Sequence, residues 1–275
     1  MGQSHEKNEA HAAVPGESGV VSKWTAIVLA GSRPGTDPMA AAAGVTLKAL
    51  IPVAGVAMVA RPVAALLGAR GVGAIRVLSQ TPDALAPVIP DNLRVTQAPS
   101  GASIAATMLA LCDDPATPWP LLVTTADHAL LTAAMVDQFV ADAAGADVAV
   151  GVVEERSLMA RLPQTKRTWL RFRGEAVSGA NLFALASPRV RPAIELWRGV
   201  EQDRKRGWRV IAALGWPVLL GAVLRLRGID ATAAAVGRRL GLVLRVVRMA
   251  DPLAAVDVDK PDDHRLVEAI LKGEA

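Results

Sequence analysis

The chain has 275 residues, of which 52% are hydrophobic, enough for one large domain with a substantial core. Its one cysteine excludes a disulfide framework and favours a reducing compartment, so we expect a cytoplasmic protein. Because the sequence has no tyrosine, only 3 phenylalanines and no nucleic-acid-binding motif, nucleic acid is not an expected partner.

The sequence predicts no membrane-spanning helix, either at the N-terminus or in the longest internal apolar run. The first 22 residues lack the apolar region of a secretory signal, and we interpret them as a disordered, uncleaved tail. The longest apolar run, at 210–224, has about 15 residues interrupted by glycine and proline, whereas a membrane span needs about 20.

Short β-rich runs alternate with Ala- and Leu-rich helical stretches, which is typical of an α/β domain with a mainly parallel sheet. The first half is predicted to contain a strand at 25–29, a Gly/Pro/Ala loop at 30–45, an extended run at 50–53 with a turn at 54–55, a helix at 62–70, strands at 75–79 and 93–97, and a helix at 103–112. The second half is predicted to contain an apolar strand at 121–124, a helix at 132–144, strands at 147–153, 168–172 and 181–184, a helical stretch at 188–240, strands at 243–247 and 255–258, and a helix at 262–272.

The helical stretch at 188–240 is interpreted as an insertion, and it carries most of the positive charge. Residues 189–248 contain 13 Lys and Arg against 4 Asp and Glu, whereas the rest of the chain has a net negative charge. This uneven distribution favours an anionic partner, either a phosphorylated substrate or lipid headgroups.

The first chemical signal is a loop suited to binding phosphates. The strand at 25–29 opens into the letters LAGSR, and after an insert of small residues the chain continues with KALIPVAG from Lys48. Small residues let backbone N–H groups approach phosphates closely, and Arg33 and Lys48 can neutralise their charge. The loop is neither a P-loop nor a Rossmann fingerprint, because neither glycine pattern occurs here.

The second signal is Asp127, which directly follows an apolar strand. Ligands gather at the carboxyl ends of parallel strands in open α/β sheets, so a carboxylate at this position can reach a bound ligand. An Asp here could instead cap the next helix, but Thr132 is available for that role.

The third signal is the segment VDVDKPDDH at 256–264. On a predicted strand, the spacing of Asp257 and Asp259 puts both carboxylates on one face, so both could face one hard cation together with Asp127. The structural alternative is that Asp262 caps the last helix and Asp259 supports the turn before it.

In this order, the segments LAGSR, KALIPVAG, PSGAS, TTADHALLT, SGANLFAL and VDVDKPDDH resemble the motifs of the molybdenum-cofactor-guanylyltransferase-like NTP transferases, within the nucleotide-diphospho-sugar transferase superfamily. The resemblance covers about residues 24–187 and 243–272. It implies a GT-A-like three-layer α/β/α fold with a mostly parallel central sheet. Two departures are that LAGS replaces the usual LAGG and that an insert lengthens the loop between Arg33 and Lys48. The helical insertion has no counterpart in the short molybdenum-cofactor enzymes.

The resemblance also implies a role for individual residues. Arg33, Lys48 and Asp127 would be catalytic, Asn181 would contact the acceptor, and Asp127 with Asp259 would hold Mg²⁺, with Asp257 left open as the alternative ligand. The residues implied in nucleotide binding are Leu29, Ala30, Gly31, Ser32, Arg33, Lys48, Pro99, Ser100, Gly101 and Ser103.

Residues 23–275 are therefore expected to form a Mg²⁺-dependent nucleotidyltransferase domain. An oxygen of a phosphorylated acceptor would attack the α-phosphorus of an NTP in line and expel pyrophosphate, with positioning and charge neutralisation providing most of the catalysis. One alternative is a GT-A glycosyltransferase that consumes an NDP-sugar, although the chain has Asp127-His128-Ala129 where such enzymes have a DxD pair. A further alternative is a non-catalytic protein that binds nucleotides or membranes.

For the insertion we expect helices around Trp197, Trp208 and Trp216 that cover the acceptor side or touch a membrane surface peripherally. A packed helical subdomain with solvated arginines fits the composition equally well.

Overall fold

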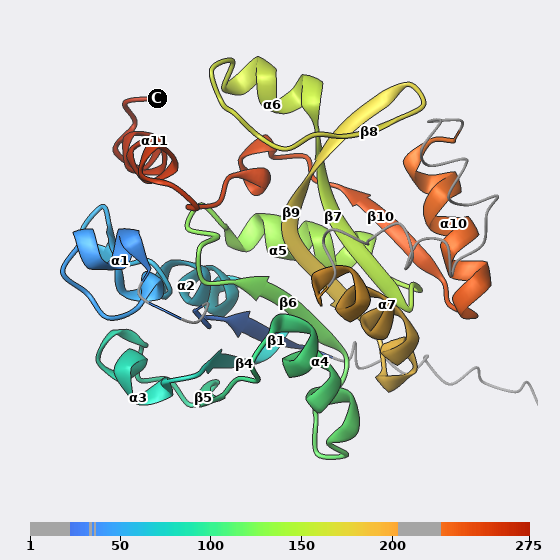
Figure 1. The fold of residues 1–275 in the computed structure, drawn as a ribbon, viewed down its shortest axis with the longest axis horizontal. Coiled ribbons are helices and arrows are strands. Elements are labelled where there is room, and N and C mark those ends of the chain that lie inside the picture. Colours follow the sequence, from blue (N-terminus) through green and yellow to red (C-terminus); the bar gives the residue numbers. More distant parts are fainter. Residues whose placement is uncertain (1–22, 33–34, 36, 203–226) are drawn as a thin grey trace, which may run out of the picture.

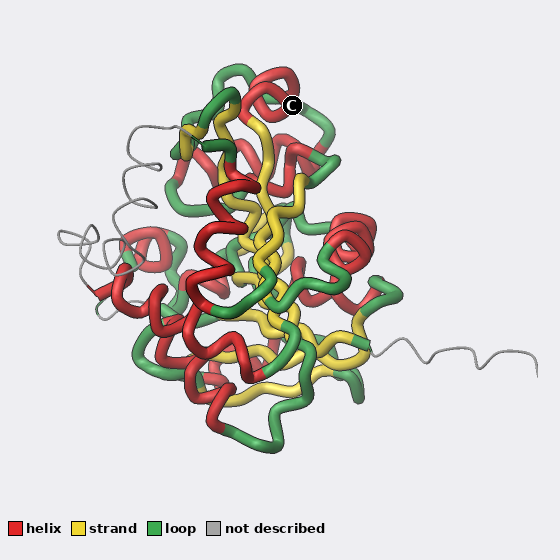
Figure 2. Tube along the Cα trace, turned by 90° about the vertical axis from the view of Figure 1, so that its right-hand side faces the viewer, coloured by secondary structure: helices red, strands yellow, loops and turns green. Residues whose placement is uncertain are grey.

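The computed structural model describes residues 23–32, 35, 37–202 and 227–275. The predicted tail at 1–22, the centre of the predicted insertion and Arg33 lie outside these residues. In the described part, a central sheet lies between two layers of helices (Figures 1 and 2). The three-layer α/β architecture expected from the sequence is thereby confirmed.

The central sheet has eight strands in the order β10-β7-β9-β6-β1-β4-β5, with β8 paired to β9. Six of these strands have parallel neighbours: β5, β4, β1 and β6 form one parallel run, and β7 and β10 form a separate pair. Strand β9 runs antiparallel to β6, β7 and β8. A short antiparallel pair, β2 and β3, stands apart. The strands are β1 Trp24–Leu29, β2 Pro52–Val53, β3 Val56–Ala57, β4 Val72–Ser79, β5 Val95–Pro99, β6 Leu121–Thr125, β7 Val148–Glu154, β8 Leu170–Phe172, β9 Glu175–Leu185 and β10 Leu244–Arg248.

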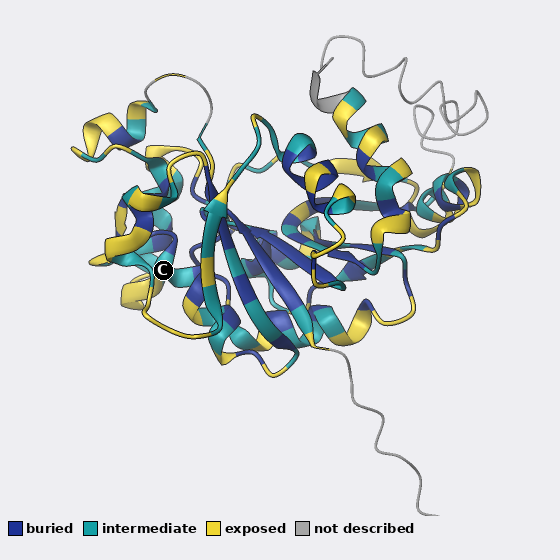
Figure 3. Ribbon diagram, turned by 90° about the horizontal axis from the view of Figure 1, so that it is seen from below, coloured by how far each residue is buried: buried dark blue, intermediate teal, exposed yellow. Residues whose placement is uncertain are grey.

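Helices cover both faces of the sheet because its central strands alternate between two apolar clusters. Ala26 and Val28 of β1 pack with α2 and α5, whereas Ile27 and Leu29 pack with α4 and α7 on the opposite face. The centre of the sheet is accordingly buried (Figure 3). The α-helices are α1 Pro38–Ala42, α2 Ala60–Gly68, α3 Pro82–Leu85, α4 Ile104–Asp113, α5 Ala133–Asp142, α6 Glu155–Arg161, α7 Arg191–Gln202, α10 Ile229–Leu240 and α11 Pro261–Lys272. Short 3₁₀ helices are η1 Lys48–Leu50, η2 Ala86–Val88, η3 Pro188–Val190 and η4 Pro252–Ala255.

Helix caps explain where several helices begin. The Thr132 side chain accepts a hydrogen bond from the Met135 backbone N–H, which confirms Thr132 as the N-cap of α5. Asp37 caps α1 in the same way, with proline at the first helical position. The segment predicted as a loop at 30–45 therefore contains helix α1, which was not predicted from the sequence.

Two strand predictions need correction. The strand predicted at 181–184 is the end of a longer strand that begins at Glu175. The strand predicted at 255–258 is wrong, because residues 252–255 form the 3₁₀ helix η4 and residues 256–259 join no sheet. Val256 and Val258 are buried with Asp257 between them, so the apolar alternation is real, but it arises from an extended segment without a strand partner.

Candidate active site

The carboxyl ends of β1 and β6 lie side by side and bring two of the predicted signals together. Leu29 pairs with Thr125 in parallel register, and the Ala126 N–H donates to the Leu29 carbonyl oxygen at 3.0 Å. The loop after β1 and Asp127 after β6 therefore start from the same edge of the sheet, as expected for ligand-binding loops of an α/β fold.

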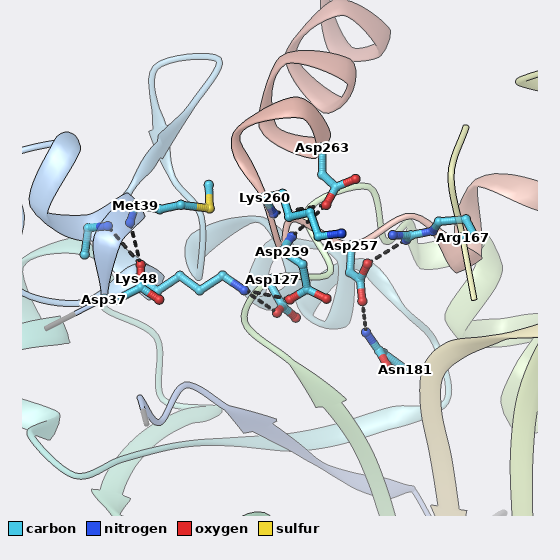
Figure 4. A network of polar contacts seen from close by, with 11 residues as sticks. Asp37, Met39, Lys48, Asp127, Arg167, Asn181, Asp257, Asp259, Lys260 and Asp263 are labelled. Carbon is cyan, nitrogen blue, oxygen red and sulfur yellow. Dashed lines mark hydrogen bonds and ion pairs between the residues drawn. The ribbon is translucent and has the colours of Figure 1, made fainter. Parts of the chain in front are cut away.

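Lys48 lies between two carboxylates that are distant in sequence. Its Nζ is 2.9 Å from Asp127 Oδ2 and 3.0 Å from Asp259 Oδ1, although Asp259 is 211 positions away along the chain (Figure 4). Burial by itself lowers the pKa of the Lys48 ammonium, but the charges and hydrogen bonds of Asp127 and Asp259 together raise this pKa above 10.5. Lys48 is therefore a fixed positive charge at the site.

The C-terminal helix helps to place Lys48 opposite the acidic segment. Glu268 of α11 accepts a hydrogen bond from the Ala54 N–H at 2.9 Å, and His264 lies 2.7 Å from the Pro52 carbonyl oxygen. These contacts join α11 to the β2–β3 turn, just after Lys48 in the chain. The segment that carries Asp259 is thereby brought next to the KALIPVAG motif.

The segment with the two predicted acidic residues contacts Asp127 directly. The Val258 N–H donates to the Asp127 carbonyl oxygen at 3.1 Å, and the Val258 side chain is fully buried. The following helix, α11, begins at Pro261, and Asp263 in its first turn accepts hydrogen bonds from the N–H groups of Asp259 and of the N-cap residue Lys260. The helix cap suggested for Asp262 is thus provided by Asp263, and the side chain of Asp259 faces Lys48.

Asp257 has different partners from Asp259. Its Oδ1 is 2.6 Å from an Arg167 nitrogen, and its Oδ2 accepts a hydrogen bond from Asn181 Nδ2 at 2.9 Å (Figure 4). Burial raises the pKa of Asp257, Arg167 counteracts this in part, and the carboxylates of Asp259 and Asp127 add to the rise. Of the two acidic residues, Asp259 is the one that contacts Lys48.

Asn181, the predicted acceptor contact, adopts an unusual backbone conformation beside this cluster. Its φ is 48°, in the left-handed region that asparagine tolerates better than most residues, and β9 shifts its register against β7 at this point. The irregularity accompanies the contact between the Asn181 carboxamide and Asp257. Strained backbone of this kind is concentrated at functional sites.

The predicted nucleotide loop is held by hydrogen bonds of its own backbone N–H groups. The Ala30 N–H donates to the Leu78 carbonyl oxygen at 2.8 Å. The Ser32 N–H donates to the side-chain oxygen of Gln80 at 2.9 Å, and the Gln80 amide nitrogen lies 3.4 Å from the Gly101 carbonyl oxygen. Gln80 thus joins the loop after β1 to the turn after β5. Gln80 could not be predicted from the sequence, because a single glutamine after a strand belongs to no motif.

Strand β5 ends at Pro99, and the turn that follows it, with Ser100, Gly101 and Ser103, is held close to α4. The Gly101 N–H donates to Thr107 Oγ1 at 3.0 Å, and a Cβ on Gly101 would lie 3.1 Å from the Thr107 backbone nitrogen. Ser103 caps α4 by accepting from the Ala106 N–H. Within the described ranges, the buried Ser100 Oγ and Gln97 Oε1 have no hydrogen-bond partner, so both are available to a ligand.

The fit of a divalent cation can be tested on Asp127. Its Oδ1 is buried and has no hydrogen-bond partner among the residues that the structure describes, while its Oδ2 shares the Lys48 ammonium with Asp259. The described residues contain no group of three or more acidic, histidine or cysteine ligands that could hold a metal. Two carboxylates are nevertheless a donor set typical of Mg²⁺, which completes its shell with water and substrate phosphates.

His128 and Ala129 take no part in this cluster. His128 is fully buried, and burial lowers its pKa to about 4, so the ring is neutral near pH 7. Ala129 is buried too. Asp127 is therefore the single residue of Asp127-His128-Ala129 that offers a charged ligand.

Of the tryptophans assigned to the insertion, Trp208 and Trp216 lie outside the described residues. Trp197 in α7 stacks on Phe183 of β9 with the ring centroids 5.5 Å apart, so it packs against the sheet. None of the helices within the described ranges has the length and apolar character needed to cross a membrane.

Comparison with known proteins identifies the family. The model of the MobA-like NTP transferase domain matches residues 26–218, which include Lys48, Asp127 and Asn181, whereas Asp257 and Asp259 lie beyond the match. A hypothetical transferase from Thermus thermophilus has a similar structure, with a TM-score of 0.72 and 30% identity over 88% of this chain and 99% of that one. A comparison with curated proteins gave no significant match.

Two more distant structures support the fold alone. The 4-diphosphocytidyl-2C-methyl-D-erythritol synthase of Anaerococcus prevotii has a TM-score of 0.56 at 8% identity, over 92% of this chain and 97% of that one. CMP:2-keto-3-deoxy-manno-octonic acid synthetase, complexed with CTP, has a TM-score of 0.57 at 13% identity, over 92% of this chain and the whole of that one. With the family match and the fold in agreement, the chain belongs to the MobA-like NTP transferases and is an enzyme of the nucleotidyltransferase type.

Proposed function

We propose that the enzyme transfers the NMP group of an NTP to a phosphorylated acceptor and releases pyrophosphate. The observation that supports this most strongly is the contact of Lys48 Nζ with both Asp127 and Asp259. It joins a cation that can neutralise phosphates to two carboxylates suited to a divalent metal, at the strand ends where the family's first loop begins. The cluster combines the two kinds of charge that transfer at phosphorus requires.

In the proposed reaction, an oxygen of the acceptor phosphate forms a bond to the α-phosphorus of the NTP. The bond from the α-phosphorus to the oxygen bridging to the β-phosphate breaks, and pyrophosphate leaves with that electron pair. A phosphate acceptor is ionised near neutral pH because the second pKa of a phosphate monoester is about 6. The protein therefore has to supply orientation and charge, and it needs no general base.

Lys48 would neutralise charge on the α-phosphate and the leaving pyrophosphate, because the ammonium stays protonated at any physiological pH. The loop of Leu29, Ala30, Gly31 and Ser32 would lie along the phosphates, together with Arg33. The Ala30 N–H already donates to the Leu78 carbonyl oxygen and the Ser32 N–H to Gln80, so these two N–H groups hold the loop in place. The turn with Pro99, Ser100, Gly101 and Ser103 would bind the base, where Ser100 Oγ is free to pair. Asn181 would lie on the acceptor side of the cluster.

Mg²⁺ is the proposed cofactor, held by Asp127 and Asp259. The unpaired Asp127 Oδ1 and the exposed carboxylate of Asp259 are the oxygens that can take it. When bound, the ion supplies further charge neutralisation to the phosphates. Because both carboxylates contact the Lys48 ammonium, they lie close enough to share a cation.

The glycosyltransferase alternative has less support. A DxD pair requires a second carboxylate at the third position, and here that position is the buried Ala129 next to the neutral, buried His128. The non-catalytic alternative, with or without membrane contact, predicts that the metal carboxylates are dispensable.

The test is an assay for pyrophosphate. Purified protein is first screened with the four NTPs and Mg²⁺ for thermal stabilisation, and the stabilising NTP is then incubated with a panel of sugar phosphates and polyol phosphates. We expect pyrophosphate with at least one acceptor, and a rate at least about 100-fold lower for Asp127→Asn. Glycosyl transfer from an NDP-sugar without pyrophosphate would refute the proposal, and so would Mg²⁺-dependent NTP binding that survives Asp127→Asn unchanged.

A further inference from the structure

Arg167 has no part in the reaction proposed above, yet its side chain lies beside the acidic cluster. It belongs to the segment between α6 and β8, and only 9% of its side chain is exposed. Burial of a guanidinium is unfavourable unless its N–H groups are paired. The partners of Arg167 therefore indicate what keeps it in this position.

All the contacts of Arg167 that the structure describes go to one short stretch of chain. Nε donates to the Ala255 carbonyl oxygen at 3.0 Å, and a terminal nitrogen both contacts the same oxygen and lies 2.6 Å from Asp257 Oδ1. Asn181 takes the other oxygen of Asp257. Figure 4 shows Asp257 between Arg167 and Asn181, on the side of the cluster away from Lys48.

These contacts immobilise the segment that ends in Asp259. Ala255 and Asp257 are held by Arg167, and the next residue, Val258, is buried and bonded through its N–H to the Asp127 carbonyl oxygen. With the residues before it fixed, Asp259 is left with its carboxylate 3.0 Å from Lys48 Nζ. The segment has no strand ladder to hold it, so the Arg167 contacts take that role.

We propose that Arg167 is a positioning residue for the nucleotidyl-transfer site: through its contacts with Ala255 and Asp257, it fixes residues 255–259 so that Asp259, and not Asp257, faces Lys48 and the cation. The inference rests on the proposed function, because it assumes that Asp127 and Asp259 hold a divalent cation. It assigns Asp257 to the support of the site, with its negative charge balanced by Arg167.

The proposal can be separated from the alternative in which Asp257 itself binds the cation. Removing Arg167 takes a positive charge away from the site and frees a carboxylate. Both changes favour binding of a divalent cation if geometry plays no part. If Mn²⁺ binding becomes weaker after loss of Arg167, the cause is therefore the lost geometry of residues 255–259. Weaker binding supports the positioning role of Arg167, whereas tighter binding supports Asp257 as a ligand of the cation.

The experiment titrates the purified full-length protein with Mn²⁺ alone, with free Mn²⁺ measured by electron paramagnetic resonance. We expect Arg167→Met to weaken Mn²⁺ binding about 10-fold, as loss of a residue that orients a metal ligand does. In the Asp257→Asn background, the same substitution should weaken Mn²⁺ binding by clearly less than about 10-fold, because the ion pair with Asp257 is already lost and only the contacts with the Ala255 carbonyl oxygen remain to be removed. Tighter or unchanged Mn²⁺ binding by Arg167→Met would overturn the proposal, and so would a full effect in the Asp257→Asn background.

Three further variants complete the design. Arg70→Met removes an arginine that is 91% exposed and pairs with Asp137 away from the site, and it should bind Mn²⁺ like the wild type. Arg167→Lys keeps the charge but loses the planar guanidinium, whose Nε makes the second bond to the Ala255 carbonyl oxygen, so it should weaken binding too. It replaces Arg167→Met if that variant does not fold. Asp127→Asn tests the proposed function separately: if it leaves Mn²⁺ binding intact, the cation site itself is wrong, whatever Arg167 does.

Discussion

The two halves of the proposed site are built in different ways. In the nucleotide half, at residues 29–32 and 99–103, hydrogen bonds come mainly from backbone groups such as the N–H of Ser32 and the N–H of Gly101. In the cation half, charged side chains from four separate segments contact one another, as Lys48 does with Asp127. A backbone cradle tolerates changes of side chain, whereas a charge cluster loses its function with any one member. Substitutions should therefore have large effects in the cation half and small effects in the nucleotide half.

The largest effect is expected at Lys48. Lys48→Met removes the cation that Asp127 and Asp259 share and the charge proposed to act on the phosphates. We expect kcat/KM to fall about 1,000-fold, or about 4 kcal/mol of transition-state stabilisation. Steady-state pyrophosphate release measures it. Lys272→Met, at an exposed lysine in the last turn of α11, is the matched control, and an equal loss there would mean that the effect is not specific to the cluster.

A change in the scaffold should affect stability without affecting catalysis. Asp137 in α5 accepts hydrogen bonds from the N–H groups of Arg70 and Gly71 and from the Arg70 side chain. Burial by itself raises the pKa of Asp137, but these bonds and the Arg70 charge lower it below 3.8 on balance. Because the folded-state pKa is depressed, the stabilisation is present above pH 3.8 and is lost as the pH falls through the folded pKa.

Asp137→Asn should accordingly reduce the free energy of unfolding by about 2 kcal/mol at pH 7 and by much less near pH 2. Urea unfolding at the two pH values measures the difference. If wild type and variant differ by the same free energy of unfolding at both pH values, the charge-based explanation is contradicted. A loss of kcat would contradict the assignment of Asp137 to the scaffold.

At Asn181 the contributions of side chain and backbone can be separated. Asn181→Gly and Asn181→Ala both remove the hydrogen bond to Asp257, but only glycine adopts a φ of 48° without strain. We expect the alanine variant to be less stable than the glycine variant by about 1 kcal/mol. Both should lose a similar share of kcat. Equal stability in chemical denaturation would show that the bulge at Asn181 relaxes.

The smallest effect is expected in the nucleotide half, at Gln80. Gln80→Ala removes the acceptor for the Ser32 N–H and loosens the contact with Gly101, but the backbone donors remain. The KM for the NTP should rise about threefold with kcat unchanged, in keeping with the loss of one neutral hydrogen bond. If Gln80→Ala lowered kcat/KM as much as Lys48→Met does, the distinction between the two halves of the site would be removed.

The parts of the site that follow motifs at strand ends could be predicted from the sequence. Asp127 directly after an apolar strand, Lys48 in KALIPVAG and Asp259 in VDVDKPDDH indicated a shared site, and the structure brings the three together. The fold followed from the alternation of strands and helices in the same way. These features depend on local patterns and on the edge at which parallel strands end.

The parts that could not be predicted depend on long-range contacts without a pattern. Arg167 lies in a loop with no periodicity, and its partner Ala255 is 88 positions away. The alternation of Val256 and Val258 is what a strand would show, and the sequence cannot reveal that no neighbouring strand pairs with it. The proposed division of roles between Asp257 and Asp259 rests on their contacts with Arg167, Asn181 and Lys48, so the sequence left it open.

The central claim is that Lys48, Asp127 and Asp259 form one site for the phosphates of an NTP and a divalent cation. A crystal structure with a non-hydrolysable NTP analogue and Mg²⁺ tests it most directly. We predict the α-phosphate within hydrogen-bonding distance of Lys48 Nζ and the ion on the carboxylates of Asp127 and Asp259. A nucleotide bound elsewhere, or an ion on Asp257 with Asp259 free, would contradict the account.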